Sequence, residues 1–416
     1  MKIRRDEYLQ RLLSVRHNRM IKVITGMRRC GKSFLLFHLF ADALRAEGID
    51  EKHIVKINLE DRRNKALRNP DELLKYIDSR LLDERMHYIL LDEIQLVDEF
   101  EDVLNSYLQV PNADVYVTGS NARFLSKDVI TEFRGRGEEI RLRPLSFEEL
   151  ASARDGISPE NVLQEYMIYG GLPQTISMNT NEEREQYLCN LFMHTYLRDI
   201  KDRHAIKLDD DLEELICIVA SSIGGLINPR KLMNTFQSVK KSAISQTTIK
   251  KYLEFLQDAF LIERAVRYDI KGKRYIDTPA KYYFEDLGLR NALLHFRQIE
   301  ETHLMENLIY NELRLRGMSV DVGEVTVNEV SPDGQNVRRQ LEVDFVCNKG
   351  YERIYIQSAL ALPTADKQEQ EFRPLSKIKD NFLKVVIVGG SQPTYKNDDG
   401  ILILNILDFL RGESIL

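Results

Sequence analysis

A segment near the N-terminus has the residue types and spacing of a phosphate-binding loop. It reads Gly-Met-Arg-Arg-Cys-Gly-Lys-Ser from Gly26 to Ser33. Glycines permit backbone angles and close approaches that a Cβ would block, so successive N–H groups can point at phosphate oxygens. Lys32 would reach the β- and γ-phosphates of ATP, and the Ser33 hydroxyl would ligate Mg²⁺. The candidate cofactor-binding residues are Gly26, Met27, Arg28, Arg29, Cys30, Gly31, Lys32, Ser33 and Phe34.

Two adjacent carboxylates, Asp92 and Glu93, follow the apolar run 88–91 later in the chain. A continuous apolar run is typical of a buried parallel strand. Ligands of open α/β sheets collect at the carboxyl ends of such strands. Asp92 would therefore hold Mg²⁺ together with Ser33, and Glu93 would polarise the attacking water. The pair indicates hydrolysis of ATP rather than binding alone.

Two further polar groups have catalytic interpretations, each with an alternative. Ser120 and Asn121 follow the apolar segment 115–119, where either side chain could orient the attacking water. Either could equally be the N-cap of a following helix. Arg136 stands between two glycines and is either a solvated loop charge or a finger aimed at phosphate. Such fingers stabilise transition-state charge from the same chain or from a neighbour.

These residues need a sheet to position them, and the surrounding pattern predicts one. The apolar run 20–24 precedes the glycine-rich segment, and a helical pattern over 33–47 follows it. Further strand patterns at 53–59, 87–91 and 114–119 alternate with helical ones. This alternation predicts a parallel sheet covered on both faces.

The motifs, taken in order, resemble a large prokaryotic family of AAA-type ATPases, in which an AAA-14 ATPase domain precedes a DUF4143 region. The segments that carry the resemblance are 26–33, 91–95, 118–121, 135–136, 144–147 and 169–173. The resemblance implies an additional-strand (ASCE) P-loop ATPase that assembles into a ring or another oligomer. It gives Lys32, Ser33, Asp92 and Glu93 the Walker roles and Arg136 the finger role. It leaves the substrate open.

A second block, residues 206–285, has the pattern of a winged helix-turn-helix. Three helical patterns are followed by two strand patterns, and positions 229–281 hold 12 Lys and Arg against 5 Asp and Glu. A basic third helix and wing would contact DNA. The candidate DNA-binding residues are Lys240, Lys241, Lys250, Lys251, Lys271, Lys273 and Arg274. The alternative is a protein-binding module whose lysines form a solvated face.

Residues 286–416 show an α-β-β-β-α-β order that resembles the restriction-endonuclease-like, PD-(D/E)xK, nuclease fold. The resemblance places Glu306, Asp344 and Gln357 at the positions of the metal-binding residues. Gln357 is a neutral ligand, and the position of the nuclease lysine is occupied by Ala359. Metal-assisted hydrolysis needs acidic ligands around an activated water. We therefore expect a degenerate, inactive nuclease site in a domain kept for binding or assembly.

Composition narrows the class of protein. The chain has 416 residues, a net charge of −6 and four cysteines without metal or redox spacing, which fit a reducing cytoplasm. The histidines form no His-x-x-His pattern, so no zinc site is expected. The longest apolar run, 215–227, is too short to span a bilayer. The predicted domains are a P-loop ATPase domain, a helical lid or connector, a winged helix and a nuclease-like domain, at residues 1–150, 151–205, 206–285 and 286–416.

Together these patterns predict an α/β, Mg-ATP-hydrolysing AAA-type ATPase. It would couple ATP turnover to binding or remodelling of duplex or branched DNA, as a cytoplasmic homo-oligomer without a membrane partner. One alternative is a nucleotide-dependent switch or scaffold for partner proteins. The other is an ATP-regulated nuclease.

Overall fold

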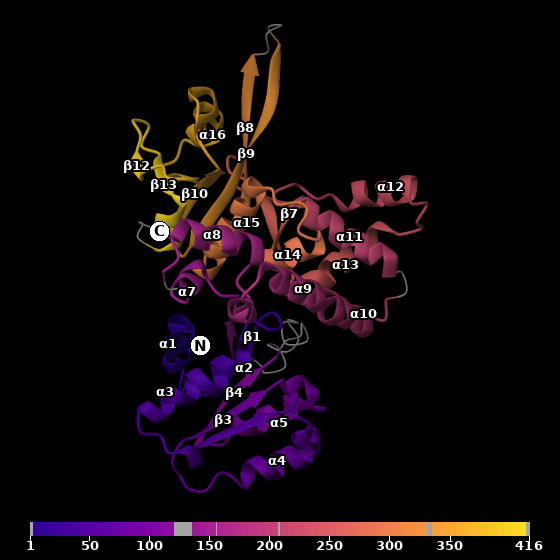
Figure 1. Ribbon diagram of the computed structural model, residues 1–416, viewed down its shortest axis with the longest axis vertical. Coiled ribbons are helices and arrows are strands. Elements are labelled where there is room, and N and C mark those ends of the chain that lie inside the picture. The colour runs from indigo at the N-terminus through magenta and orange to yellow at the C-terminus, as the bar shows by residue number, and fades with distance from the viewer. Residues whose placement is uncertain (1–2, 120–134, 155, 207–208, 331–334, 413–416) are drawn as a thin grey trace. The chain divides into compact units, whose positions relative to one another are not determined.

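The computed structural model divides the chain into two compact units (Figure 1). The first comprises Met1–Pro144 with Asp258–Phe260, and the second comprises Leu145–Gln257 with Leu261–Leu416. Among the described residues, no helix is long and apolar enough to cross a membrane. The structure describes residues 3–119, 135–154, 156–206, 209–330 and 335–412.

The first unit is built on a parallel sheet of five strands in the order β2-β3-β4-β1-β5. β4 lies between β1 and β3, so an additional strand separates the strand before the glycine-rich loop from the strand that ends in Asp92. The predicted parallel sheet is confirmed. Because its strands are parallel, their carboxyl ends all lie at the same end of the sheet. The strands are β1 (Ile21–Thr25), β2 (Ile54–Asn58), β3 (His87–Asp92), β4 (Ala113–Thr118) and β5 (Gly137–Arg141).

Helices cover both faces of this sheet. On one face, α4 and α5 bury Leu73, Ile77, Phe100 and Leu104 against alternate strand residues. On the other, the ring of Phe40 packs against the tyrosines of β3 and β4. The helices are α1 (Asp6–Ser14), the continuous run α2 (Lys32–Phe34), η1 (Leu35–Phe40) and α3 (Ala41–Ala46), then α4 (Pro70–Asp78) and α5 (Phe100–Tyr107).

The second unit begins with helices around a tight turn at Gly170 and Gly171. The carboxylate of Asp286 accepts the N–H of Gly171 at 2.8 Å and that of Leu289 at 2.9 Å. Gly170 has a φ of +71°, and a Cβ there would lie 2.4 Å from both Asp286 oxygens, so only glycine fits. The helices are α7 (Phe147–Ala151), α8 (Pro159–Tyr169), η6 (Pro173–Ser177), α9 (Asn181–Leu191), η7 (Phe192–Leu197), α10 (Arg198–His204) and α14 (Leu287–Leu293).

Three helices and a hairpin follow, as the sequence pattern predicts. An isolated bridge joins Ile227, between α11 and α12, to Ala280 of the hairpin. The hairpin also continues into a larger sheet, because β6 pairs in parallel with β8. The elements are α11 (Asp209–Ser221), α12 (Pro229–Val239), α13 (Gln246–Asp258), β6 (Ile262–Asp269) and β7 (Arg274–Phe284).

The remaining chain completes an eight-stranded sheet in the order β12-β13-β11-β10-β9-β8-β6-β7. The predicted α-β-β-β-α-β order is confirmed, and the paired ends of β8 and β9 extend as a long ribbon (Figure 1). The elements are α15 (Glu301–Leu315), β8 (Ser319–Val330), β9 (Asn336–Lys349), β10 (Glu352–Ala359), α16 (Ala365–Ser376), β11 (Leu383–Val388), β12 (Tyr395–Lys396), β13 (Leu402–Asn405) and α17 (Ile406–Leu410).

Candidate nucleotide-binding site

The glycine-rich loop follows the carboxyl end of β1 and needs both of its glycines. Gly26 has a φ of +138° and Gly31 a φ of +102°, conformations that other residues rarely adopt. A Cβ at Gly26 would lie 2.0 Å from the carbonyl oxygen of Leu142, directly after β5. The backbone of the loop therefore lies in close contact with the backbone at Leu142 of the same chain. This contact restricts the direction in which the N–H groups of the loop can point.

A buried arginine from before α1 braces the same loop. The guanidinium of Arg5 donates to the carbonyl oxygen of Cys30 at 3.3 Å and to that of Arg143 at 2.8 Å. It therefore joins the loop to the chain that leaves β5. No sequence pattern indicates this role of Arg5, because its partners are backbone carbonyl groups.

Lys32 begins the helix after the loop and is buried. Its ammonium donates to the carbonyl oxygens of Gly26 and Met27, each at 2.9 Å. The side chain of Lys32 therefore links the end of the loop to its beginning, and its positive charge lies next to the loop backbone. Ser33 and Phe34 are exposed on the next positions of the helix.

The carboxylate of Asp92, at the end of β3, accepts two hydroxyl groups on one oxygen. Ser33 Oγ lies 2.9 Å from Asp92 Oδ1, and Thr118 Oγ1 lies 2.6 Å from the same atom. Burial raises the pKa of Asp92, the two hydroxyl hydrogen bonds oppose that shift, and the charge of Glu93 adds to it. The motif in the loop and the strand-end carboxylate are thus brought together, as the sequence predicts.

Glu93 follows Asp92 in a left-handed backbone conformation, with a φ of +56°. Its N–H donates to Thr118 Oγ1 at 3.0 Å, and the side-chain amide of Gln95 donates to its carboxylate. A non-glycine residue with positive φ is uncommon and is often found at functional sites. The two adjacent carboxylates thus have different partners, since Asp92 accepts the hydroxyls of Ser33 and Thr118 and Glu93 accepts the amide of Gln95.

The donor set at Ser33 and Asp92 fits Mg²⁺. A hydroxyl and a carboxylate oxygen are the hard ligands that this ion prefers, and it keeps several waters besides. A cation beside Asp92 would favour the ionised carboxylate and so oppose the effect of burial. Ser33 and Asp92 are therefore the residues that would hold the ion.

Thr118 is a polar residue of this site that the sequence argument missed. It ends β4, next to β1 and β3, and is fully buried. Its sequence signal is a hydroxyl group at the end of a predicted strand, directly before Gly119. Ser120 and Asn121, the predicted water-orienting residues, lie outside the described residues.

Arg136 lies at the amino ends of the strands, whereas the phosphate loop lies at their carboxyl ends. It precedes β5, is exposed, and its carbonyl oxygen accepts the N–H of Ile21 at the start of β1. The loop begins after Thr25, at the far end of the same strand, about 13 Å away along the backbone. The structure therefore does not bring Arg136 to the phosphate loop of its own chain.

The predicted DNA-binding residues fall into two groups. Three have partners within the chain: Lys240 pairs with Glu214, Lys271 donates to the carbonyl of Thr326, and Arg274 pairs with Asp269. The other four are exposed and form no ion pair with any described residue. They are Lys241, Lys250, Lys251 and Lys273.

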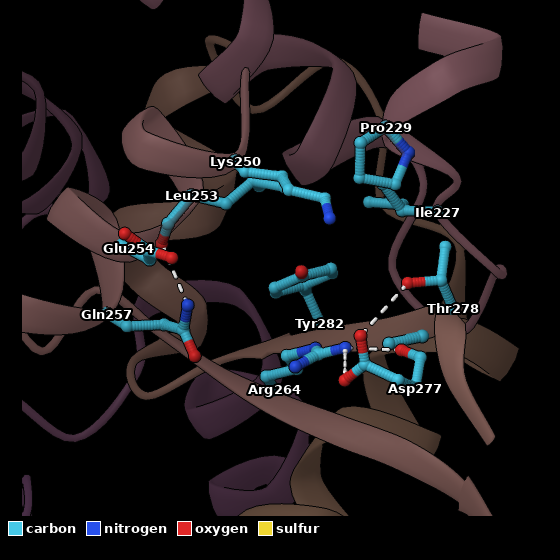
Figure 2. Close-up of a pocket in the computed structure, with 11 residues that line it drawn as sticks. Ile227, Pro229, Lys250, Leu253, Glu254, Gln257, Arg264, Asp277, Thr278 and Tyr282 are labelled. Carbon is cyan, nitrogen blue, oxygen red and sulfur yellow. Dashed lines mark hydrogen bonds and ion pairs between the residues drawn. The ribbon is translucent and has the colours of Figure 1, made fainter. Parts of the chain in front are cut away.

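Lys250 borders a pocket of about 130 Å³ between α13 and the β6–β7 hairpin (Figure 2). Its ammonium extends into the opening, toward the side of the pocket formed by Pro229 and Thr278. On the hairpin side, Arg264 is held by Asp277 at 2.7 Å, and Tyr282 lines the floor. Lys250 thus faces a recess, whereas the other three free lysines line no part of it.

The residues of the nuclease-like site lie together but around a lysine from the hairpin. Lys281 of β7 is buried and pairs with Glu306 at 2.9 Å and with the exposed Glu342 at 2.6 Å. Tyr283 also donates to Glu306, at 2.6 Å. Burial alone would lower the pKa of Lys281, but the neighbouring carboxylates outweigh it and raise that pKa. Glu306 therefore already has a fixed cation as its partner.

Asp344 and Gln357 complete this cluster. The carboxylate of Asp344 accepts the N–H of Ser358 at 2.7 Å, and the Gln357 amide donates to Glu371 at 3.3 Å. Burial, followed by the charge of Glu306, raises the pKa of Asp344 well above its ordinary value. Because protonation of a carboxylate competes with metal binding, this shift weakens Asp344 as a metal ligand. Sequence reasoning missed Lys281, because it lies far from these residues in the chain.

Comparison with protein families identifies two regions. Residues 18–151 match the family described as AAA domain, and residues 160–300 match a domain of unknown function, DUF8612. The expected DUF4143 region is therefore wrong: the family that follows the AAA domain is a different one, although the AAA-type resemblance holds.

Solved structures with some likeness include the Aeropyrum pernix ORC1 protein in complex with DNA, at 13% identity over 70% of this chain and 92% of that one, with a TM-score of 0.29. A Vibrio cholerae protein is 13% identical over 94% of this chain and 96% of its own, with a TM-score of 0.21. These low TM-scores carry no argument about function.

Curated relatives extend over the whole chain. An uncharacterized protein from Methanocaldococcus jannaschii is 29% identical over 93% of this chain and 85% of its own length. An uncharacterized protein from Haemophilus influenzae is 34% identical over 98% of both chains. The chain therefore belongs to the same family of AAA-domain proteins as this Haemophilus influenzae protein.

Proposed function

We propose that this protein is a Mg-ATP-hydrolysing ATPase that couples turnover to binding or remodelling of DNA. The observation that carries the ATPase part is the single oxygen, Asp92 Oδ1, that accepts both the Ser33 hydroxyl at 2.9 Å and the Thr118 hydroxyl at 2.6 Å. This contact joins the phosphate loop, β3 and β4 at the edge where ligands of parallel sheets bind.

Each residue of the site has a task that suits its position. The loop amides and Lys32 bind the phosphates and offset their charge. Ser33 and Asp92 hold Mg²⁺, which neutralises charge on the phosphate oxygens when bound. Glu93, held next to Asp92 but turned by its left-handed backbone, accepts a proton from the attacking water.

The DNA part rests on the local charge and the element order of the second unit. The bridge from Ile227 to β7 and the order of three helices then a hairpin support a winged helix in this region. Lys241, Lys251 and Lys273 are exposed without ion-pair partners among the described residues. Such lysines are available for phosphate contacts, which supply most of the non-specific affinity for DNA.

The test is the steady-state ATPase rate of wild type and of Glu93→Gln, with and without duplex and four-way-branched DNA. Glu93→Gln should lose about 10²–10⁴ of the rate, the usual contribution of a general base, while it still binds ATP. Glu84→Gln is the matched control, since Glu84 is an exposed carboxylate in the turn before the same strand. The proposal is supported if DNA raises the ATPase rate of wild type and this increase is absent in Glu93→Gln. The coupling is refuted if neither duplex nor branched DNA changes the rate.

A second candidate function, a nucleotide-dependent switch that binds partner proteins, is favoured by one observation. Lys240, Lys271 and Arg274 already bind groups of their own chain, so fewer of the basic residues are available for DNA. This alternative predicts slow turnover, no stimulation by DNA and an oligomeric state that changes with ATP. Sedimentation of the protein with and without ATP distinguishes the two.

A further inference from the structure

Two buried histidines lie side by side where β2 and β3 begin, at the edge opposite the phosphate loop. Ile54 of β2 pairs with Tyr88 of β3, so the residues directly before them, His53 and His87, are neighbours across the sheet. Their ring centroids are 4.8 Å apart and the rings are inclined at 68°. Both imidazoles are almost wholly buried.

A carboxylate from the turn before β3 joins the pair. Both oxygens of Asp83 lie 3.1 Å from His53 Nε2. The backbone N–H of Leu82 donates to His87 Nε2 at 3.2 Å, which directs a lone pair of that ring toward the same turn. One nitrogen of each histidine and one oxygen of Asp83 all lie within 4.8 Å of one another.

The second observation concerns a ring nitrogen of His87. Its Nδ1 atom is buried and forms no hydrogen bond of ordinary geometry with any described residue, although backbone groups of Arg85 and Asn112 interact with the ring. Buried polar atoms in folded proteins nearly always have a hydrogen-bond partner, because an unpaired one destabilises the fold. A metal ion bonded to Nδ1 would give this atom a partner, and the ring proton would then lie on Nε2 in place of the hydrogen bond from Leu82.

We propose that His53, Asp83 and His87 bind a divalent transition-metal ion, with Zn²⁺ as the expected occupant. Two imidazoles and one carboxylate form a mixed nitrogen and oxygen set, which Zn²⁺ accepts in a tetrahedral arrangement. Mg²⁺ and Ca²⁺ prefer oxygen ligands throughout, so they do not suit this site. The fourth position is left for water.

The surroundings provide both access and support for the ion. Asp83 is about one-third exposed, so an ion can reach the cluster from solvent. Arg85 pairs with Asp83 at 2.7 Å and with Asp50 at 3.5 Å, so this arginine holds the Asp83 carboxylate in place. Coordination of a neutral ring through His53 Nε2 leaves the ring proton on Nδ1, where a carboxylate oxygen of Asp50 lies 3.9 Å away.

Such a site would fasten the turn before β3 to the starts of two strands. It lies at the opposite edge of the sheet from Lys32 and Asp92, so its role is structural and its occupancy does not depend on ATP. The expectation of no zinc site rested on local spacing. His53 and His87 are far apart in the chain, and only the parallel register brings them together.

The test is titration of the metal-free full-length protein with Zn²⁺ by calorimetry, together with the visible absorption of Co²⁺ as a probe of the ligands. We expect one equivalent to bind and the melting temperature to rise. His53→Asn and Asp83→Asn should each weaken Zn²⁺ binding by about tenfold or more. Loss of a residue that only supports a ligand already lowers metal affinity by about tenfold, and loss of a ligand itself should lower it at least as much. Asp83→Asn preserves the shape of a partly exposed side chain and so should fold.

Two controls make the result specific. Glu84→Gln removes the neighbouring exposed carboxylate, and His303→Asn removes a partly exposed histidine outside the cluster. Both should bind Zn²⁺ as wild type does. The proposal is overturned if wild type shows no saturable binding, or if His53→Asn and Asp83→Asn bind unchanged. It is also overturned if the Co²⁺ spectrum shows thiolate charge-transfer bands, because the ligands would then include cysteine.

Discussion

Thr118 and Asp92 are joined by a hydrogen bond of 2.6 Å between the hydroxyl of one and Oδ1 of the other. The same hydroxyl accepts the N–H of Glu93 at 3.0 Å. One side chain at the end of β4 therefore fixes both the carboxylate assigned to Mg²⁺ and the backbone of the residue assigned as general base. This arrangement makes Thr118 a positioning residue for the proposed hydrolysis.

Removing this hydroxyl without changing the shape of the side chain should lower activity. We expect Thr118→Val to lower both the apparent affinity for Mg²⁺ and the rate of ATP hydrolysis. Each should fall by about 10- to 100-fold, which is the usual effect of losing a group that orients a metal ligand. Thr118→Ser keeps the hydroxyl and should retain most of the rate. ATPase rates measured across a Mg²⁺ titration compare the two. A loss of rate in Thr118→Ser together with an unchanged rate in Thr118→Val would contradict this role of the hydroxyl and mean that the methyl group matters instead.

The position of Arg136 predicts that it acts on a neighbouring subunit. We expect Lys32→Ala and Arg136→Ala to be inactive separately, and a mixture of the two to hydrolyse ATP faster than the sum of the separate samples. In the mixture, some sites combine an intact Lys32 with an intact Arg136 from the adjacent chain. Arg19→Ala is the control, since Arg19 is an exposed arginine two residues before β1. A mixture no faster than its parts would exclude this role.

The division of the basic residues predicts unequal effects on DNA binding. We expect Lys251→Ala to weaken binding to duplex DNA at low salt and to reduce the salt slope by about one, as loss of one phosphate contact does. Lys240→Ala should change binding little, because Lys240 already pairs with Glu214. Fluorescence anisotropy across a salt series measures both. Identical losses would show that the ion pair with Glu214 does not compete with DNA.

The Asp286 carboxyl predicts a pH dependence of stability. Burial raises its pKa to about 6, and the N–H groups of Leu289 and Gly171 oppose the shift. Below pH about 4 the group is protonated in both folded and unfolded chains, so stability is complete. As pH rises to about 6, the unfolded chain ionises first, and roughly 3 kcal/mol of stability is lost.

Asp286→Asn removes this titration. The stability of wild type relative to the variant should therefore fall between pH 4 and 6 and stay constant above it, as measured by urea unfolding. Asp202→Asn, at an exposed position of α10, should show no such change. If the difference in free energy of unfolding between wild type and Asp286→Asn is the same at every pH, the raised pKa of Asp286 is contradicted.

The parts of the site that could be predicted from sequence are those encoded locally. The glycine-rich loop is a contiguous motif, and Asp92 ends a continuous apolar strand, so their meeting followed from the geometry of parallel sheets. The contact between Ser33 and Asp92 confirms this reasoning. The strand order, with β4 next to β1, agrees with the resemblance to AAA-type ATPases.

The parts that could not be predicted depend on partners distant in the chain. Arg5 acts through backbone carbonyls, which have no sequence pattern. Lys281 reaches the acidic cluster only because the hairpin joins the larger sheet. His53 and His87 become neighbours through the register of two parallel strands. In each case the tertiary pairing, not the local spacing, creates the chemistry.

The pairing of β6 with β8 bears on how this protein can be divided, both in the laboratory and in evolution. The hairpin belongs at once to the three-helix region and to the eight-stranded sheet, so a fragment ending near residue 285 would expose the backbone edge of β6. Unpaired strand edges associate with other chains. A gene rearrangement or truncation at this point would therefore yield an aggregating product, and the two halves of this unit must be inherited together.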